Sequence, residues 1–298
     1  MATVKEPVAF LGIGTMGHAM ATSARRAGIP TVAWNRNPDA ARDLAALGVA
    51  LAETPADAAR RADIVVTMVT DADVVVSIAK DQGMLAALAP GALWVQMSTI
   101  GVAGIERVAA VADAERPDVI LVDAPVSGSE DPAKKGQLTI FASGPDEARP
   151  RLGPLFDALG QRTIWVGSVG AGSRLKLVAN AWLAFAAEAV NVPLALAGQL
   201  GLATETVVNA LAGNPLVSAW QASKLERIAR GDFSEQFALS LALKDVRLAL
   251  ETAGDDRFRT LACLADEWQG VVDLGLGDRD LTVVAWALEQ ARQRADPT

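Results

Sequence analysis

The stretch from Val8 to Ala21, VAFLGIGTMGHAMA, joins a short apolar run of β-rich composition to a helical pattern. Between the two stands Gly12-Ile13-Gly14-Thr15-Met16-Gly17, which has the spacing G-x-G-x-x-G. In such a turn the first glycine allows a tight bend, the second lets the backbone approach a pyrophosphate, and the third lets helix and strand pack closely. The N-terminus of the following helix then faces the phosphates. The motif therefore predicts a dinucleotide-binding βαβ unit in which these six residues contact the cofactor.

The next predicted strand ends in VAWNRNPDA, which places Asn35, Arg36 and Asn37 directly after it. Folds that prefer NAD usually carry a carboxylate here, about twenty residues after the glycine motif, to bind the ribose 2′-hydroxyl. A carboxylate would repel a 2′-phosphate, whereas an arginine and two amides can bind one. We therefore expect NADP(H) as the cofactor, bound in part by Asn35, Arg36 and Asn37. The alternative is an ordinary arginine in an exposed turn.

The pattern of apolar residues divides the chain into two parts. From residue 7 to residue 166, apolar runs of strand length alternate with helical segments, and the runs are continuous, as in strands covered on both faces. After Gly167 the segments are of helix length, with apolar residues spaced by about 3.6. We predict an α/β fold, with an N-terminal Rossmann-type doubly wound sheet in residues 1–166 and an all-α C-terminal domain in residues 167–298.

Composition narrows the function classes. The chain has 298 residues, 51% of them hydrophobic, and a formal net charge of −8, which argues against nucleic acid or an anionic membrane as partner and favours a small molecule. The single Cys263 excludes an intramolecular disulfide, and the first residues show no export signal, so we expect a cytoplasmic protein. With no tyrosine, one histidine and one cysteine, neither a Tyr-x-x-x-Lys dehydrogenase site nor a zinc alcohol dehydrogenase site can be assembled, and no metal site is expected.

Three further loops follow predicted strands. They contain Val69-Thr70-Asp71, Ser98-Thr99 and Ser127-Gly128-Ser129. Ligands of open α/β sheets bind at the carboxyl ends of strands, so the first two loops are expected to face the cofactor. A strand-end Ser-Gly offers a hydroxyl and unblocked amides, which suit a carboxylate or carbonyl oxygen. The alternatives are helix caps at Asp71 and Ser98, and a plain turn for the third loop.

In the apolar helical run VGAGSRLKLVANAW, Lys176 is the one charged residue that follows Arg174. Asn180 follows Lys176 one turn later. Residues four apart share a helix face, so both side chains could meet one small polar object. The alternative is a lysine that snorkels to water. The run continues to about Leu200 and is long enough to span a membrane, but Asn180, Glu188 and Asn191 interrupt it. We expect a core helix, or a helix that joins two subunits of a homodimer or tetramer through the C-terminal domain.

Taken in order, these motifs resemble the β-hydroxyacid dehydrogenases, which include 3-hydroxyisobutyrate dehydrogenases and the tartronate semialdehyde and glyoxylate/succinic semialdehyde reductases. The resemblance rests on the glycine motif, WNR, STI, DAPVSGS, the Gly-x-Gly-x-x-x-Lys-x-x-x-Asn of residues 170–180 and Lys244-Asp245 in LALKDVRLAL, and it covers nearly the whole chain. It implies that Lys176 is the catalytic lysine, that Asn180 and Ser127 to Ser129 surround the substrate, and that Thr99 and Lys244 lie near the cofactor. Ser98, beside Thr99, is expected to contact the substrate.

The Ser-Gly-Ser loop is similar to the glyoxylate/succinic semialdehyde reductase branch. This implies reduction of a small aldehyde or keto acid by a hydride from NADPH and a proton from Lys176, with Asn180 as the second catalytic residue. The apolar AWLAFAAE after Asn180 departs from the pattern of the family and leaves the substrate open. Two alternatives remain: an imine reductase-like enzyme, although those generally carry aspartate or tyrosine in place of Lys176, and a non-catalytic scaffold that binds NADPH. An exposed pair on an amphipathic helix is the alternative for Lys244-Asp245.

Overall fold

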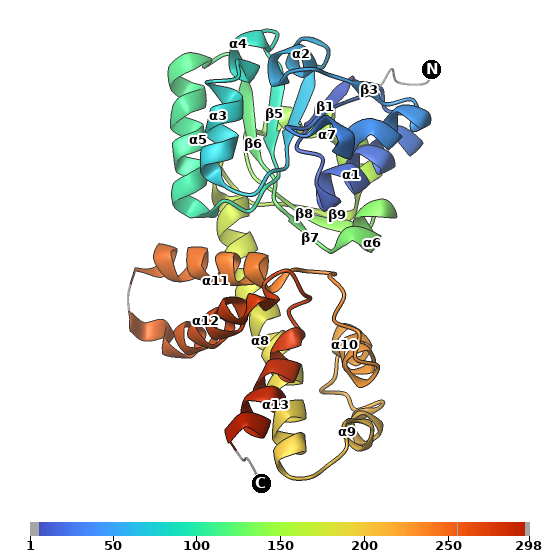
Figure 1. The fold of residues 1–298 in the computed structure, drawn as a ribbon. Helices are drawn as coiled ribbons and strands as arrows, with labels where there is room; N and C mark the ends of the chain where they lie inside the picture. Colours follow the sequence, from blue (N-terminus) through green and yellow to red (C-terminus); the bar gives the residue numbers. More distant parts are fainter. Residues whose placement is uncertain (1–5, 255, 296–298) are drawn as a thin grey trace. The chain divides into compact units, whose positions relative to one another are not determined.

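The computed structural model describes residues 6–254 and 256–295, and the chain forms two compact units, residues 1–176 and 177–298 (Figure 1). The outer ends of the two predicted domains, residues 1–5 and 296–298, lie outside the described residues. The long helix α8 (Ala171–Gln199) begins in the first unit and continues into the second.

A six-stranded parallel sheet forms the first unit, and the order of its strands is β3-β2-β1-β4-β5-β6. The strands are β1 (Val8–Leu11), β2 (Thr31–Trp34), β3 (Ala50–Leu51), β4 (Ile64–Thr67), β5 (Leu93–Gln96) and β6 (Ile120–Asp123). The order runs outward from β1 to β3 and then returns to β4 on the other side of β1, as in a doubly wound Rossmann-type sheet. The predicted fold class is confirmed.

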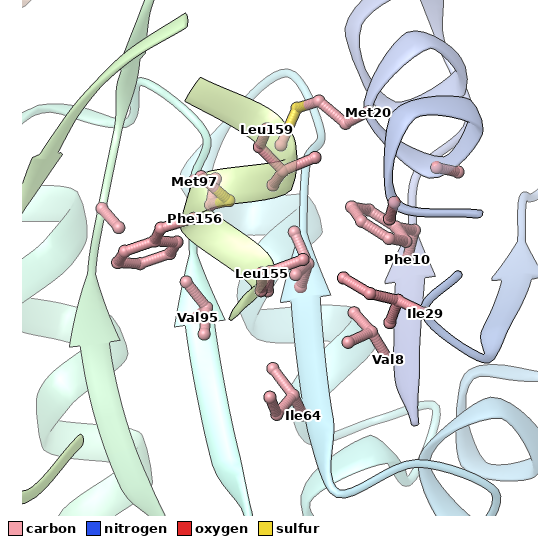
Figure 2. Packing of buried hydrophobic residues seen from close by; sticks show 14 of the residues in the cluster. Val8, Phe10, Met20, Ile29, Ile64, Val95, Met97, Leu155, Phe156 and Leu159 are labelled. Carbon is pink, nitrogen blue, oxygen red and sulfur yellow. The ribbon is translucent and has the colours of Figure 1, made fainter. Parts of the chain in front are cut away.

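Helices cover both faces of this sheet, which explains why its strands are apolar on both sides. Val8 and Phe10 of β1 face a core built with α1 (Thr15–Arg26), the 3₁₀ helix η1 (Pro38–Leu47) and α7 (Arg149–Leu159). Figure 2 shows this layer, with Leu155, Phe156 and Leu159 near Phe10, Ile64 and Val95. The alternate residues Ala9 and Leu11 face α2 (Pro55–Arg60), α3 (Ala72–Ala79), α4 (Met84–Ala87) and α5 (Gly101–Glu115).

The last three strands of the unit form a sheet of their own, which corrects the expectation of one parallel sheet up to residue 166. They are β7 (Val126–Ser127), β8 (Leu138–Ala142) and β9 (Gly160–Trp165), with β7 and β8 antiparallel and β8 and β9 parallel. The short helix α6 (Glu130–Lys134) joins β7 to β8, and η2 (Asp146–Ala148) precedes α7. An antiparallel pair needs no crossover helix, so this short connection is sufficient.

The second unit is helical. Its helices are the rest of α8, α9 (Thr204–Leu211), α10 (Ala219–Ala229), α11 (Leu239–Ala253), α12 (Arg259–Val271) and α13 (Val283–Ala295), with short turns η3 (Asp256–Phe258) and η4 (Val272–Leu276). Trp268 of α12 is fully buried in a core with Leu239, Leu243 and Val246 of α11 and Val284 of α13. The prediction of an all-helical C-terminal part is confirmed.

A buried ion pair lies in the second unit, between Lys224 of α10 and Asp280 before α13. Lys224 Nζ is 2.8 Å from Asp280 Oδ2, and both side chains are almost wholly removed from solvent. Asp280 also accepts hydrogen bonds from the backbone N–H groups of Gln236, Phe237 and Thr282. Burial lowers the pKa of Lys224, although the Asp280 carboxylate acts in the opposite direction. The pair joins three segments that are distant in sequence.

The division between the units falls inside α8, whereas the predicted boundary, between residues 166 and 167, marks the end of the strands. The start of α8 is held by the first unit: Gly172 N–H donates to Ser143 Oγ, and Ser173 N–H donates to Asp123 Oδ2. The spacing of apolar residues shows where strands give way to helices, but not these contacts.

Helix α8 is less buried than a core helix should be, which corrects the first of the two expectations for it; the second, a helix that joins subunits, stays a prediction. By length and composition α8 could cross a membrane, and only 33% of its most apolar window is buried inside the structure. Its exposed positions include Val178, Trp182, Phe185, Val192 and Leu196. One face of α8 is therefore in the core and the opposite face is apolar and exposed.

Candidate active site

The glycine motif forms the turn from β1 into α1, and its three glycines differ in what surrounds them. A Cβ on Gly12, whose φ is +101°, would lie 2.2 Å from the Met68 carbonyl oxygen, and one on Gly17 would lie 1.9 Å from the Gly12 carbonyl oxygen. Gly12 and Gly17 are thus required by the packing of the protein itself. At Gly14, by contrast, the described residues beyond its own chain neighbours place no atom within 4 Å of where a Cβ would stand.

Gly14 is the N-cap residue of α1, so the open space lies at the N-terminus of that helix. Backbone N–H groups at a helix N-terminus attract anions, and a missing side chain leaves room for one to approach. The residues present therefore fit the pyrophosphate of a dinucleotide. The protein's own packing does not require a glycine at position 14, but a bound phosphate would.

The loop after β4 lies beside the glycine motif. Strands β1 and β4 are neighbours in the sheet and are the pair at which the winding direction reverses. A Cβ on Gly12 would meet atoms of Met68 and Val69, so Gly12 packs closely against these two residues. The predicted segments 12–17 and 69–71 are therefore in contact. A reversal point of this kind leaves a crevice at the carboxyl ends of the strands, where dinucleotides bind in doubly wound sheets.

Two amide side chains shape the loop after β2. Asn35 Oδ1 accepts the Ile13 N–H at 2.9 Å, and Asn35 Nδ2 donates to the Asn37 carbonyl at 2.9 Å. Asn37 Oδ1 accepts the Asp39 N–H and caps η1. Arg36 between them is exposed, and within residues 6–254 and 256–295 it makes no hydrogen bond or ion pair. This leaves the Arg36 guanidinium as the group of the loop that can meet a phosphate.

Ser98 makes contacts within the protein that sequence reasoning did not predict. It is fully buried, and its hydroxyl accepts the Val69 N–H at 2.8 Å. Gln96 holds Ser98 in turn, because its side-chain amide donates to the Ser98 carbonyl and accepts the Ser98 N–H, each at 2.8 Å. In this structure Ser98 positions the loop at Val69, and its contact with substrate stays a prediction. Gln96 was missed, although a polar residue that ends an apolar strand could have signalled it.

The other predicted residues of these loops lie near the same edge of the sheet. Asp71 Oδ1 accepts the Val74 N–H and caps α3, as its alternative interpretation held, and the Thr70 hydroxyl donates to Asp71 Oδ2. Thr99 is half-buried just before α5.

Ser127 and Ser129 are half-buried at the end of β7 and the start of α6. Gly128 between them is exposed and has a φ of +132°, where a Cβ would meet Leu138 at 2.8 Å. A side chain at position 128 would therefore be strained, and the loop is built for glycine.

Lys176 and Asn180 are one turn apart on α8, and their exposed fractions are 8% and 6%. Asn180 Nδ2 donates to Asp245 Oδ2 on α11. Lys244 Nζ lies 2.9 Å from Asp245 Oδ1, as an ion pair rather than a directed hydrogen bond. Asp245 is buried, so the alternative of an exposed Lys244-Asp245 pair is wrong for Asp245. Its link to Asn180 was missed because the two residues are 65 positions apart.

The site chemistry present in the described residues is thus a helix N-terminus open at Gly14, an arginine, hydroxyls and a buried lysine with a neighbouring amide. Across residues 6–254 and 256–295, no group of three or more His, Cys, Asp or Glu side chains is placed to hold a metal ion. The assignment of each residue to cofactor or substrate stays a prediction.

Two family models match the chain, and together they cover most of it. Residues 7–167 match the family described as the NAD binding domain of 6-phosphogluconate dehydrogenase. Residues 170–288 match the family described as NAD-binding of NADP-dependent 3-hydroxyisobutyrate dehydrogenase.

Individual relatives cover almost the whole chain. Glyoxylate/succinic semialdehyde reductase 1 of Arabidopsis thaliana is 30% identical, over 96% of this chain and 99% of its own length. The crystal structure of 3-hydroxyisobutyrate dehydrogenase from Salmonella typhimurium has a TM-score of 0.85 and 27% identity, over 94% of this chain and 99% of that one. An imine reductase from Pseudomonas sp. has a TM-score of 0.61 and 23% identity, over 95% and 99%, which is a likeness of fold alone.

Proposed function

The chain belongs to the β-hydroxyacid dehydrogenase family of NAD(P)-dependent oxidoreductases that act on CH–OH groups, and from that membership we propose that it interconverts a small β-hydroxy acid and its aldehyde or keto form with NADP(H). The proposed substrates are of the glyoxylate, succinic semialdehyde or 3-hydroxyisobutyrate type. The Ser-Gly-Ser loop and the relative named glyoxylate/succinic semialdehyde reductase support that class.

The observation that carries the proposal is the burial of Lys176. A lysine that snorkels keeps its ammonium group in water. Lys176 is only 8% exposed, on a helix whose opposite face is open to solvent at Val178 and Trp182. Burial of an ammonium group costs free energy unless the group is paired and hydrogen-bonded. Ionisable side chains in such surroundings cluster at active sites.

The proposed chemistry divides between cofactor and protein. A bound reduced nicotinamide supplies the hydride. Lys176 donates a proton to the carbonyl oxygen, on which negative charge develops, and its neutral form accepts that proton in the oxidative direction. Asn180, held by Asp245, orients the same oxygen without adding charge. Ser127, Gly128 and Ser129 bind the substrate carboxylate through hydroxyl and backbone N–H groups.

We propose NADPH rather than NADH because of the loop after β2. A 2′-phosphate needs a cation, and Arg36 is exposed, with its neighbours Asn35 and Asn37 engaged in shaping the loop. Where an NAD-preferring site usually carries a carboxylate for the ribose, this loop has Asn35, Arg36 and Asn37.

We also propose that a second copy of the chain covers the exposed face of α8. The positions Val178, Trp182, Phe185, Ala189, Val192 and Leu196 are all exposed and follow each other at spacings of four and three. Such a spacing places side chains along one seam of a helix and is typical of helices that pack in pairs at about 20°. An apolar seam of this length exposed to water would be unfavourable in a monomer.

The test of the activity uses a panel of small aldehydes, keto acids and a cyclic imine with NADPH, followed by absorbance at the nicotinamide band. We expect turnover of glyoxylate or succinic semialdehyde. Turnover of the imine alone would favour the imine reductase-like alternative. NADPH binding without any turnover would favour the non-catalytic scaffold.

Lys176→Met separates the catalytic role from a structural one. Without a positioned acid, kcat for aldehyde reduction is expected to fall by about 10²- to 10⁴-fold, with NADPH affinity unchanged. The decrease of the wild-type rate at high pH, where Lys176 loses its proton, should be absent from the residual activity of the variant. The control is Lys80→Met, which removes a lysine whose side chain is 57% exposed and paired with Glu115. A Lys176→Met enzyme that keeps most of its kcat would refute the mechanism.

A further inference from the structure

Asp123, the last residue of β6, holds the first turn of α8 through its carboxylate. Ser173 N–H donates to Asp123 Oδ2 and Ser173 Oγ donates to Asp123 Oδ1, each at 2.8 Å. Asp123 is fully buried and Ser173 nearly so. The two residues are 50 positions apart in sequence, so these bonds fix a long-range contact rather than a local cap.

Ser143 and Gly172 complete this junction. Ser143 pairs with Asp123 through two backbone hydrogen bonds of 2.9 and 2.7 Å, and its hydroxyl lies 3.2 Å from Asp123 Oδ2. The same hydroxyl accepts the Gly172 N–H at 2.9 Å. A Cβ on Gly172 would lie 2.2 Å from the Phe141 carbonyl and 2.9 Å from the Asp123 carbonyl. The helix thus approaches the strand ends as closely as a glycine permits.

The junction is one helical turn before Lys176. Ser173 and Lys176 are three residues apart, about 4.5 Å along the helix axis, and therefore share a face. Both are buried. Any rotation or shift of the first turn of α8 moves the Lys176 side chain by a similar amount, and a displacement of about 1 Å at a reacting group can cost about a hundredfold in rate.

We propose that Asp123 is a positioning residue for the reaction: its carboxylate docks the start of α8 on the end of β6 and thereby sets the position of Lys176. This inference rests on the proposed function, because it gives Lys176 the role of proton donor. It also explains the Gly-x-Gly-x-x-x-Lys motif, whose second glycine allows the close docking and whose lysine follows the docked turn.

The hydrogen bonds of this junction act on the Asp123 carboxylate in turn. Burial raises the pKa of Asp123, and hydrogen bonds from Ser173 and Ser143 offset part of that effect. A carboxylate near a helix N-terminus is favoured by the helix dipole. The other charged contact of this turn is Arg174, whose Nη2 lies 3.0 Å from Glu106 Oε1 on α5, with both side chains more than half exposed.

The test compares Asp123→Asn and Ser173→Ala with Glu106→Gln as a matched control. Each variant removes a contact of the same helical turn, but only the first two remove a buried one. Three quantities are measured: kcat for the aldehyde that the wild type reduces, the Kd for NADPH, and hydrogen exchange of residues 170–176. Lys176→Met is assayed in parallel.

We expect kcat of Asp123→Asn to fall by about 10- to 100-fold, in line with the cost of small misplacements, with the NADPH Kd within about twofold of wild type and exchange in residues 170–176 clearly faster. Ser173→Ala should show the same changes to a smaller extent, and it serves as the test if Asp123→Asn does not fold. Glu106→Gln should be silent.

Asp123→Asn and Ser173→Ala enzymes that lose thermal stability but keep wild-type kcat would overturn the proposal, since Asp123 would then be structural only. Equal effects of Glu106→Gln would overturn it too. If Lys176→Met keeps its kcat, the proposed function itself fails. If Lys176→Met is inactive while the Asp123 and Ser173 variants are not, only the positioning role fails.

Discussion

Replacing Gly14 with alanine should weaken cofactor binding without lowering the stability of the protein. The φ and ψ of Gly14, −80° and −170°, are open to any L-residue, and apart from its chain neighbours the described residues place no atom within 4 Å of the added Cβ. The methyl group would instead occupy the space at the N-terminus of α1 in which we place the pyrophosphate. The change therefore tests the ligand rather than the fold.

The expected effect on stability is small because two terms offset each other. Alanine reduces the conformational entropy of the unfolded chain and so adds about 0.4–1 kcal/mol to stability. It is also a poorer N-cap than glycine, by about 1 kcal/mol. The net change in the free energy of unfolding should be below about 1 kcal/mol. A methyl group that blocks close approach of a phosphate should raise the NADPH Kd at least tenfold, or about 1.4 kcal/mol.

Gly17→Ala is the matched comparison. Its Cβ would lie 1.9 Å from the Gly12 carbonyl oxygen, so α1 has to move away from the strand end. Overpacking of this kind costs about 1–3 kcal/mol or more. Urea unfolding measures the stability of both variants, and isothermal titration calorimetry measures their affinity for NADPH.

Gly14→Ala should therefore keep wild-type stability and bind NADPH weakly, whereas Gly17→Ala should lose stability. An NADPH Kd within twofold of wild type in Gly14→Ala would show that the pyrophosphate does not lie at this turn. A Gly17→Ala protein as stable as wild type would refute the close contact of α1 with the glycine loop.

Three other changes probe separate features. Arg36→Asp should raise the NADPH Kd more than tenfold and leave NADH nearly unaffected, and equal weakening of both cofactors would show that the loop after β2 does not bind the 2′-phosphate. Leu196→Glu, on the exposed face of α8, should convert a dimer or tetramer into a monomer in light scattering at micromolar concentration, whereas a monomeric wild type would contradict the proposed association. Lys224→Met leaves the buried carboxylate of Asp280 without its cation and should lower the free energy of unfolding by about 3–5 kcal/mol; a loss below about 1 kcal/mol in urea would mean that the backbone N–H groups around Asp280 suffice.

Much of the cofactor side of the site could be predicted from short stretches of sequence. The glycine motif, the loop after β2 and the loop after β4 each follow an apolar strand, and parallel strands end at a common edge. Their contact in the structure, through Gly12 against Met68 and Val69, follows from that rule. The separate three-stranded sheet did not follow, because apolar composition does not reveal the direction in which a strand pairs.

The residues that hold the predicted ones in place were not predictable in the same way. The Ser98 hydroxyl accepts the Val69 N–H, and the Gln96 side chain fixes the Ser98 backbone; neither contact was predicted. Sequence shows that a hydroxyl stands after a strand, but not whether it points to a ligand or to a neighbouring loop. That choice depends on which backbone groups the packing leaves without a partner.

The doubly wound sheet, the helical C-terminal part and the common helix face of Lys176 and Asn180 were all predictable from sequence patterns, because the periods of strand and helix are local. Tertiary packing was needed to show that Asp123 docks the start of α8, that Asp245 holds Asn180 and that one face of α8 remains exposed. Hydrogen-bond partners 50 and 65 residues apart are chosen by how whole elements pack. A buried polar group must find a partner wherever the fold brings one within reach, and no spacing along the chain encodes that distance.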